Sequence, residues 1–462
     1  MKGSVVDRSQ VVVVGLDVGT TSAKALVMTV DGEELALGRA PTVWHRTPDG
    51  VEADPDAIAT AAEQALGEAL AAVPGARAVA VGVASMAESG VLVDAADRPL
   101  APVIAWHDAR DADLLTLLQK EIGGDRFSSR TGLPLWTQWS LTKHRWLAEH
   151  HEPARRAVRR YNIAEWVVRR LGGEAATELS LASRTGWLDL ASGQPWDETM
   201  EWSRAPRAML GDLRVAGSSW GSVSPDHPLT TARGATLTVA GHDHQAAVVG
   251  AGAYGPGDEL DSCGTAEALV RTIPTGLPAF AVAALAGAGV TVGWHAVRDR
   301  WCVLGATQGG LVLQEVLADL GLRRDDLPRL DADALAARPG AAHLTVSDDG
   351  HDVMATGSAA PADRWRAATE AVTAQAARLS EQISAATGPR ASLVVAGGWS
   401  HSAALMAAKA AALGPLVRTS ANEAGARGAA LLAGLAHGTY ASYDDLPSAP
   451  RASHDSPARA TS

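Results

Sequence analysis

A short loop near the start of the sequence combines a glycine, three hydroxyl side chains and a carboxylate. In chain order these residues are Asp17, Gly19, Thr20, Thr21 and Ser22. The glycine lets backbone N–H groups approach a phosphate closely, and the three hydroxyls can donate hydrogen bonds to it. The carboxylate could hold Mg²⁺, because hard cations prefer oxygen ligands. A tight hairpin turn would use the same residue types, so the loop alone leaves both interpretations open.

A second loop of the same kind occurs about 240 residues further along the chain, at residues 261–265 (Asp-Ser-Cys-Gly-Thr). As in the first loop, a Leu-Asp pair precedes the Gly-Thr pair, here Gly264 and Thr265, and an apolar run follows. A nucleotide held across a cleft needs one phosphate loop from each half of the chain. The pair of loops therefore favours phosphate binding over two unrelated turns, and it predicts a duplicated architecture.

An acidic residue flanked by two histidines lies between the two halves, within residues 240–245. In a cleft beside a phosphate donor, Asp243 could take the proton from an attacking hydroxyl, as the base of a kinase must. His242 and His244 also have the spacing of a metal-binding pair, although the nearby sequence offers no evident third and fourth ligand. A capped turn with solvated histidines is the remaining interpretation.

Two further motifs could bind the organic parts of a nucleotide and of an acceptor. Gly397 and Gly398 end an apolar run and precede an alanine-rich segment, so an adenine and ribose could lie against their backbone. Residues 106–110 (Trp-His-Asp-Ala-Arg) combine a flat apolar face with a carboxylate and a guanidinium, which suits a polyhydroxylated ligand. A surface ion pair beside a core tryptophan would explain the same residues.

The elements expected around these motifs are those of an α/β protein. Residues 11–16 and 23–30 are β-rich runs on either side of the first loop. Asp54 can cap a helix that begins at Pro55. Residues 78–84 predict a fully buried strand, because apolar side chains fall on both of its faces. Two strands, a helix and another strand, in this order, place the N-terminal part in the α/β class.

Composition excludes several classes of protein. The net charge of −12 argues against a dedicated nucleic-acid-binding protein. Cys263 and Cys302 are the only cysteines and form no CxxC pair, which indicates a reducing cytoplasm. Residues 272–297 contain no Asp, Glu, Lys or Arg, but proline and glycine interrupt them and most of their apolar residues are alanine. We therefore expect a buried helix and strand there, not a membrane span.

In their order along the chain, the motifs resemble those of the FGGY family of carbohydrate kinases, which share the actin, hexokinase and Hsp70 ATPase fold. The resemblance extends from about residue 11 to about residue 435. It implies two ribonuclease H-like (actin-like ATPase) domains of the α/β class that face each other across a cleft. The expected boundaries are 1–245 for the N-terminal domain, 246–445 for an abbreviated C-terminal domain and 446–462 for a disordered tail.

The resemblance also implies an activity and a set of site residues. The expected reaction is ATP-dependent phosphorylation of a hydroxyl of a small sugar or polyol, with Asp243 as general base and Asp17 as the carboxylate associated with Mg²⁺. The residues expected to contact ATP are Gly19, Thr20, Thr21, Ser22, Lys24, Gly264, Thr265, Gly310, Gly397 and Gly398. The residues expected to contact the acceptor are Met86, Ala87, Glu88, Trp106, Asp108, Gln138, His242 and Asp243. No nucleic acid or membrane is expected as a partner, and a homodimer is compatible with the family.

Departures from the family pattern limit the choice of acceptor. Glycerol kinases carry an Arg-Glu pair where this chain has Ala87-Glu88, and a tyrosine where it has Gln138, so glycerol is disfavoured. Xylulokinases typically have Met-His-Gly at the first of these positions. His242 before the catalytic aspartate is similar to kinases of deoxy sugars. A family segment that follows Gly310 is missing, which keeps open a sugar- or nucleotide-binding protein of the same fold. A metal-dependent hydrolase built on the histidine pair is the third interpretation.

Overall fold

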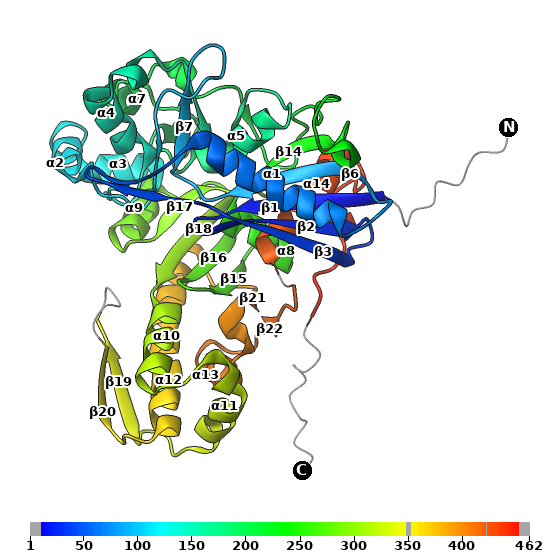
Figure 1. Ribbon diagram of the computed structural model, residues 1–462. Helices are drawn as coiled ribbons and strands as arrows, with labels where there is room; N and C mark the ends of the chain where they lie inside the picture. The colour runs from blue at the N-terminus through cyan, green and yellow to red at the C-terminus, as the bar shows by residue number, and fades with distance from the viewer. Residues whose placement is uncertain (1–10, 348–352, 422, 452–462) are drawn as a thin grey trace. The chain divides into compact units, whose positions relative to one another are not determined.

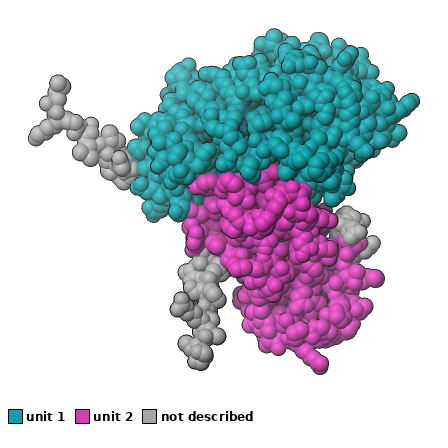
Figure 2. All heavy atoms as spheres, turned by 180° about the vertical axis from the view of Figure 1, so that it is seen from behind, with its two compact units in different colours: residues 1–250, 274–302, 423–448 teal, residues 251–273, 303–422, 449–462 magenta. Residues whose placement is uncertain are grey.

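The computed structural model describes residues 11–347, 353–421 and 423–451. The chain forms two compact units, each built from several segments (Figure 2). Unit 1 contains residues 1–250, 274–302 and 423–448, and unit 2 contains residues 251–273, 303–422 and 449–462. The predicted boundaries at 245 and 445 follow the chain, whereas the units are defined in space, so these boundaries stay a prediction.

The main sheet of unit 1 has the strand order β14-β6-β1-β2-β3 (Figure 1). β1 (Val11–Val18) and β2 (Ser22–Thr29) form the predicted antiparallel pair, and β3 (Glu34–Pro41) extends it. β6 (Arg77–Ser85) and β14 (Thr236–His242) continue the sheet parallel to β1. Because β1, β6 and β14 run in the same direction, their carboxyl ends share one edge of the sheet. This edge carries Asp17, Glu88 and Asp243.

Two helices cover this sheet, and glycines allow one of them to approach closely. α1 (Pro55–Ala71) begins with the predicted Asp54 cap and packs on β2 and β3. α14 (Ala424–His437) packs on β1 and β6, where a Cβ added to Gly15 would lie 1.8 Å from the carbonyl oxygen of Ala426. Gly82 meets α14 in the same way, since its Cβ would lie 2.1 Å from the carbonyl oxygen of Ala429. The glycines therefore set the distance between helix and sheet.

Other elements of unit 1 surround the sheet and include a second apolar core. That core contains large buried side chains such as Trp139 and Trp187. Residues 272–297 span the end of a strand, a helix and a further strand, as predicted, but the predicted burial is only partial, because residues 274–280 are mostly exposed and Phe280 is 77% exposed. The elements are α8 (Asp243–Ala251), β4 (His45–Thr47), β5 (Gly50–Ala53), β7 (Gly90–Val93), β8 (Val103–Ile104), α2 (Ala112–Glu121), α3 (Gly124–Thr131), α4 (Ser140–His150), β9 (Arg159–Asn162), α5 (Ile163–Arg170), β10 (Thr177–Glu178), α6 (Leu179–Ala182), β11 (Leu188–Asp189), β12 (Gln194–Pro195), α7 (Asp197–Trp202), β13 (Leu213–Arg214), α9 (Ala279–Gly287) and β17 (Thr291–Trp294). Among the helices within the described ranges, none is long and apolar enough to cross a membrane.

Unit 2 repeats the strand arrangement of unit 1. β15 (Asp258–Cys263) pairs antiparallel with β16 (Glu267–Pro274) and parallel with β21 (Ser392–Ala396), which pairs with β22 (Val417–Arg418). The sheet has the order β22-β21-β15-β16-β18-β17, with β18 (Arg300–Thr307) beside β16, and its first five strands match β14-β6-β1-β2-β3. The predicted duplication is therefore confirmed at the level of topology, and the α/β class with it.

The helices of unit 2 form a group of four, and a hairpin joins two of them. They are α10 (Gly309–Asp319), α11 (Leu327–Ala336), α12 (Pro361–Thr387) and α13 (Ala403–Leu413), with the hairpin β19 (Ala342–Val346) and β20 (Val353–Gly357) between α11 and α12. Most of the predicted tail, residues 452–462, lies outside the described residues. The chain before it is hydrogen-bonded, since Ser420 N donates to the carbonyl oxygen of Pro450 over 2.8 Å. The ordered chain thus continues beyond residue 446.

Candidate active site

Asp243 stands at the end of β14, where the strand passes directly into α8. Gly241 has a φ of +83°, and a Cβ at this position would lie 2.5 Å from the Ser180 hydroxyl oxygen, so glycine permits the sharp bend. The Asp243 carboxylate is held through its Oδ1 atom. The backbone N–H of His244 donates to it over 2.6 Å, and Nε2 of His242 lies 3.1 Å from it. With Oδ1 held in this way, Oδ2 can face a ligand.

The electrostatic surroundings of Asp243 favour a base that is active near neutral pH. Burial raises the pKa of Asp243 to about 7, and the Glu88 carboxylate adds to the rise, while the His244 N–H, Arg184 and Lys24 oppose it. A carboxylate with a pKa near the working pH is well matched to proton transfer, because it is deprotonated yet still basic. The pKa of a general base is tuned in this direction by burial and like charge.

Asp17 lies at the end of β1 and has the properties of a cation ligand. Burial and the charge of the neighbouring Asp243 together raise its pKa to about 7. Its Oδ1 atom is buried and has no hydrogen-bond partner among the described residues. A buried carboxylate oxygen without a donor is costly unless a cation or a proton satisfies it. Asp17 therefore fits a Mg²⁺ ligand, bound directly or through water.

The first loop is held in a fixed shape by its neighbours. Gly19 N donates to the carbonyl oxygen of Ser22 over 3.1 Å. Thr20 is fixed by two tryptophans, since Trp44 Nε1 donates to its carbonyl oxygen over 2.7 Å and Trp106 Nε1 donates to its hydroxyl over 2.9 Å. Thr21 is exposed. Its hydroxyl and the loop N–H groups are consequently the groups best placed to meet a phosphate.

Lys24 lies opposite Asp17 in the β1/β2 pair and forms an ion pair. Its Nζ is 2.8 Å from Oε2 of Glu423, a carboxylate that Arg39 also contacts. Lys24 lowers the pKa of Asp17, so it lies close enough to act on the carboxylate. Its charge is already shared, which makes it a weaker candidate for direct phosphate binding than the sequence alone suggests.

Glu88 occupies a strained backbone position after β6. Its φ is +66°, which non-glycine residues rarely adopt. Arg160 and Ser140 donate to its carbonyl oxygen over 2.6 and 2.8 Å, and Arg184 Nε donates to Oε1 of its carboxylate over 2.5 Å. Arg184 also donates to the hydroxyl of Thr291 over 3.1 Å. Such strain persists where the surroundings over-determine the conformation, as at a ligand site.

The remaining predicted acceptor residues have different environments. Met86 and Ala87 are buried, and Gln138 is half-buried before α4. The Asp108 carboxylate accepts hydrogen bonds from Val51 N over 2.5 Å and from Arg110 Nε over 2.9 Å, so it is engaged within the protein. The ion pair is buried and Trp106 is only half-buried, so a surface ion pair beside a core tryptophan does not describe these residues, and the acceptor role of Asp108 stays a prediction.

Lys143 and Arg184 are functional candidates that lie in segments similar to the family but were not predicted as site residues. Lys143 is buried, and its Nζ donates to the carbonyl oxygens of Asp108 over 2.8 Å and of Thr137 over 2.6 Å. It thereby ties the segment that carries Trp106 to the segment that carries Gln138. Arg184 is the single charged residue within residues 179–188, and such an isolated charge is the signal that could have identified it.

In unit 2, the second loop meets the start of α10. A Cβ at Gly310 would lie 2.0 Å from the carbonyl oxygen of Gly264 and 2.5 Å from that of Thr265, so only glycine allows this contact. The N–H groups in the first turn of a helix are free to bind an anion. Thr265 itself is exposed. The loop and the N-terminus of α10 thus form one set of donors.

The Gly397-Gly398 turn lies beside the same loop. Gly397 has a φ of +93°, and its Cβ would lie 2.5 Å from the carbonyl oxygen of Cys263. Near Gly398, the Arg324 guanidinium lies 3.9 Å above the ring of Trp399. Asp331 fixes the start of α13 by accepting from the Ser402 hydroxyl over 2.8 Å and from Ala403 N over 2.7 Å. Unit 2 therefore brings Gly264, Thr265, Gly310 and Gly397 together, as the sequence predicted.

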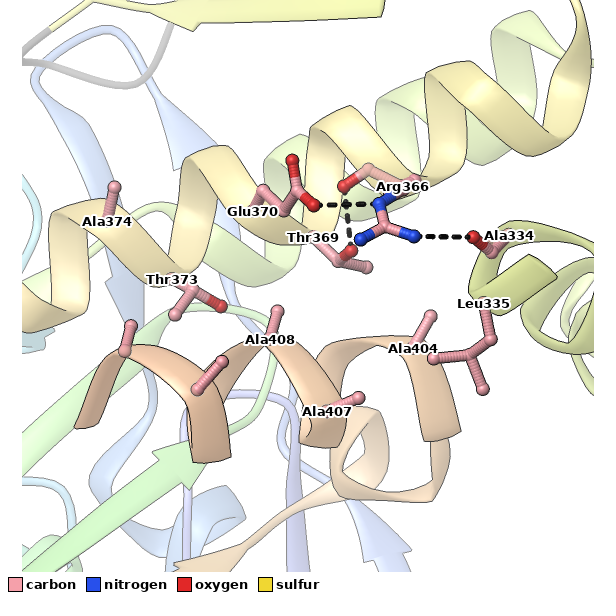
Figure 3. A pocket seen from close by; sticks show the side chains of 12 residues that line it. Ala334, Leu335, Arg366, Thr369, Glu370, Thr373, Ala374, Ala404, Ala407 and Ala408 are labelled. Atoms are coloured by element: carbon pink, nitrogen blue, oxygen red, sulfur yellow. Dashed lines mark hydrogen bonds and ion pairs between the residues drawn. The ribbon is translucent and has the colours of Figure 1, made fainter. Parts of the chain in front are cut away.

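A groove of about 420 Å³ opens between α11, α12 and α13 (Figure 3). Figure 3 shows Thr373 of α12 facing Ala407 and Ala408 of α13 across it, with Arg366 paired to Glu370 at the rim. None of the predicted ATP-contacting residues lines this groove. Its walls are mostly alanine, and we assign it no ligand.

The histidine pair does not assemble a metal site within the described part of the chain. There, the group whose ligand atoms all lie within 4.8 Å of one another is Asp261, Cys263 and Glu267 in unit 2. His242 and His244 stack edge to face at 5.3 Å between ring centres, and burial lowers the pKa of both. Because no group of three ligands forms around these rings in the described ranges and His242 Nε2 contacts Asp243, they fit support of Asp243 better than the hydrolase interpretation.

Comparison with known proteins agrees with this geometry. The N-terminal domain model of the FGGY family of carbohydrate kinases matches residues 12–250, and the C-terminal domain model matches residues 329–437. A glycerol kinase of Rhizorhabdus wittichii is 31% identical, over 93% of this chain and 89% of its own. A xylulose kinase of Streptomyces rubiginosus is 32% identical, over 68% of this chain and 64% of its own.

The solved structures show the same fold. The xylulose kinase from Rhodospirillum rubrum superimposes with a TM-score of 0.85 at 23% identity, covering 96% of this chain and 93% of that one. Fold and motifs together define a carbohydrate kinase, a phosphotransferase with an alcohol group as acceptor. The chain belongs to the FGGY family, whose domains are ribonuclease H-like. The binding protein without useful catalysis is therefore the weaker interpretation.

Proposed function

We propose that this carbohydrate kinase transfers the γ-phosphoryl group of ATP to a hydroxyl of a small sugar or polyol, with Asp243 as general base. The observation that carries the proposal is the fixed carboxylate of Asp243, whose pKa lies near 7 and whose Oδ1 is held by His244 N–H and His242. The base must reach the hydroxyl proton in a defined direction, and this fixation supplies that direction.

Different residues handle the proton of the acceptor and the negative charge of the phosphates in this mechanism. Asp243 accepts the proton of the attacking hydroxyl, and its raised pKa makes the transfer favourable near neutral pH. Asp17 would hold Mg²⁺, which when bound neutralises charge on the phosphates and on the transferred group. Lys24 limits the repulsion between Asp17 and the nearby acidic groups, because it lowers the pKa of Asp17.

Neutral donors do most of the phosphate binding in this proposal. The first loop offers N–H groups and the exposed Thr21 hydroxyl, and the second loop offers those of Gly264 and Thr265 with the N-terminus of α10. Such donors suit a chain with a net charge of −12, whose one lysine near the first loop is already paired. The Gly397-Gly398 turn would approach the nucleoside.

The acceptor site favours an uncharged, polyhydroxylated molecule. Arg184 and Glu88 neutralise each other, so the pair offers hydrogen bonds without a net charge for a carboxylate or phosphate substrate. Relatives named glycerol kinase and xylulose kinase act on such molecules. Ala87 and Gln138 replace the residues that glycerol kinases use, which favours an acceptor larger than glycerol.

We retain the cytoplasm as the expected compartment, and a homodimer as an assembly compatible with the family.

The test is acceptor-dependent release of ADP. The purified chain is assayed with Mg²⁺, ATP and a panel of pentuloses, deoxy sugars, tetritols and glycerol. The proposal expects turnover with at least one member, at a rate well above ATP hydrolysis without acceptor. Measurable ATP binding with no turnover across the panel would contradict it.

A further inference from the structure

The second phosphate loop of unit 2 rests on a buried cluster of charges. Lys409, on α13, is completely buried, and its ammonium contacts the carboxylates of Asp261 and Glu267. The distance from Nζ to Oδ2 of Asp261 is 2.5 Å. Asp261 lies in β15 at the start of the loop, and Glu267 begins β16, just after it. One ammonium therefore ties together both ends of the phosphate loop.

The same cluster reaches the first turn of α10. The Thr307 hydroxyl donates to Oε2 of Glu267 over 2.7 Å and accepts from Gly309 N over 3.2 Å. Gly310, the next residue, touches the carbonyl oxygens of Gly264 and Thr265 through its bare Cα. The contacts of Lys409 thus extend to the phosphate loop and to the N-terminus of α10, and no exposed side chain takes part in them.

Removal of the ammonium would leave two buried carboxylates facing each other. Buried ions are tolerated only when paired, and loss of one partner leaves an uncompensated charge. The pKa shifts show the same dependence. Burial and the neighbouring Asp261 raise the pKa of Glu267, and the two carboxylates raise the pKa of Lys409. The cluster holds its shape because each partner depends on the others.

Comparison of the two units sharpens the role of Lys409. Asp17 and Asp261 occupy matching positions in the repeated hairpin, at the start of each phosphate loop. In unit 1 the Oδ1 atom of Asp17 has no partner among the described residues, whereas in unit 2 Asp261 already contacts an ammonium. The spacing of metal ligands is found in unit 2 at Asp261, Cys263 and Glu267, but the ammonium group of Lys409 already supplies the positive charge there. Only the first aspartate is thereby left for an external cation.

We propose that Lys409 is a positioning residue that fixes the second phosphate loop and the N-terminus of α10 for the phosphates of ATP. It does not touch the nucleotide but acts through Asp261, Glu267 and Thr307. The inference rests on the proposed use of this loop for ATP. The hydrogen bonds of the cluster reach the two ends of the loop and the first turn of α10, so we expect it to act more strongly on binding of the phosphates than on binding of the nucleoside.

The test compares two ligands that differ only in their phosphates. Binding of Mg-ATP and of adenosine is measured by calorimetry for the unmodified chain and for Thr307→Val, which keeps the buried charges balanced. The matched control is Thr373→Val, the same change at a buried threonine of α12 whose hydroxyl has no partner among the described residues. Lys409→Met is a second, stronger variant, used where circular dichroism shows that it folds.

The inference expects Thr307→Val to raise the Kd of Mg-ATP by at least about fivefold and that of adenosine by less than twofold, with no change for Thr373→Val. Lys409→Met should act in the same direction and more strongly. Equal affinity of Thr307→Val and the unmodified chain for Mg-ATP would overturn the inference, as would an equal loss for both ligands. Failure of the unmodified chain to bind Mg-ATP would overturn the proposed function, and the inference with it.

Discussion

The acid side of the pH profile tests the assignment of Asp243 most quantitatively. If catalysis requires the carboxylate form, kcat/KM for the acceptor follows the fraction of Asp243 that is deprotonated. With a pKa of about 7, this fraction is about 0.1 at pH 6 and about 0.9 at pH 8. We therefore expect kcat/KM to rise about tenfold between these values, with saturating Mg-ATP and an acceptor well below its KM.

Substitution of a charged neighbour of Asp243 should shift this pH profile. Glu88 raises the pKa of Asp243, and it also pairs with Arg184, which lowers it. Glu88→Gln removes the negative charge that raises the pKa of Asp243, and it leaves the positive charge of Arg184 without its partner. Both changes lower the pKa of Asp243 and so shift the acid limb to lower pH. The matched control is Glu52→Gln, which alters a carboxylate paired with Arg110 elsewhere in unit 1. A profile that is flat from pH 6 to 8, or an unchanged acid limb in Glu88→Gln, would refute the reasoning.

Three further predictions concern stability and the metal. Burial raises the pKa of Glu178 to about 7, so ionisation of Glu178 destabilises the folded state as the pH rises from 4.5 to 7. In urea unfolding, the free energy of unfolding of Glu178→Gln should therefore increase by up to about 3 kcal/mol relative to that of the unmodified chain between pH 5 and 8. A difference that stays constant over this range would contradict the prediction. Gly428→Ala places a Cβ 1.7 Å from the carbonyl oxygen of Ala246 and should cost about 1–3 kcal/mol in thermal unfolding, whereas Gly287→Ala, in open space, should cost nothing. Asp17→Asn should raise the Mg²⁺ concentration for half-maximal turnover at least about tenfold, and an unchanged requirement would remove Asp17 from the metal site.

Sequence reasoning reached the local elements because their signals are local. The Asp54 cap with Pro55 gave the start of α1, and apolar runs gave β1, β2 and β6. The Leu-Asp and Gly-Thr repeats indicated the duplication, which the matching strand orders confirm. These features depend on neighbouring residues in the chain, so their spacing is sufficient to predict them.

The parts that escaped prediction depend on contacts between distant segments. Lys409 meets Asp261 across 148 positions, and Arg184 meets Glu88 across 96, so neither pair has a signature in local spacing. Lys24 was predicted as a phosphate ligand from its place near the first loop, yet Glu423, nearly 400 residues away, shares its charge. A buried charge in an apolar segment marks such residues, but its partner becomes visible only in the folded chain.

The most direct test of the central claim is the loss of the base itself. Turnover of the best acceptor is measured for the unmodified chain, for Asp243→Asn and for Asp226→Asn, a control on an exposed aspartate of unit 1. Asp243→Asn should bind Mg-ATP with unchanged affinity and lose acceptor-dependent ADP release by about 100-fold or more, the scale of general-base catalysis, while the control retains it. Retention of turnover by Asp243→Asn would contradict the account.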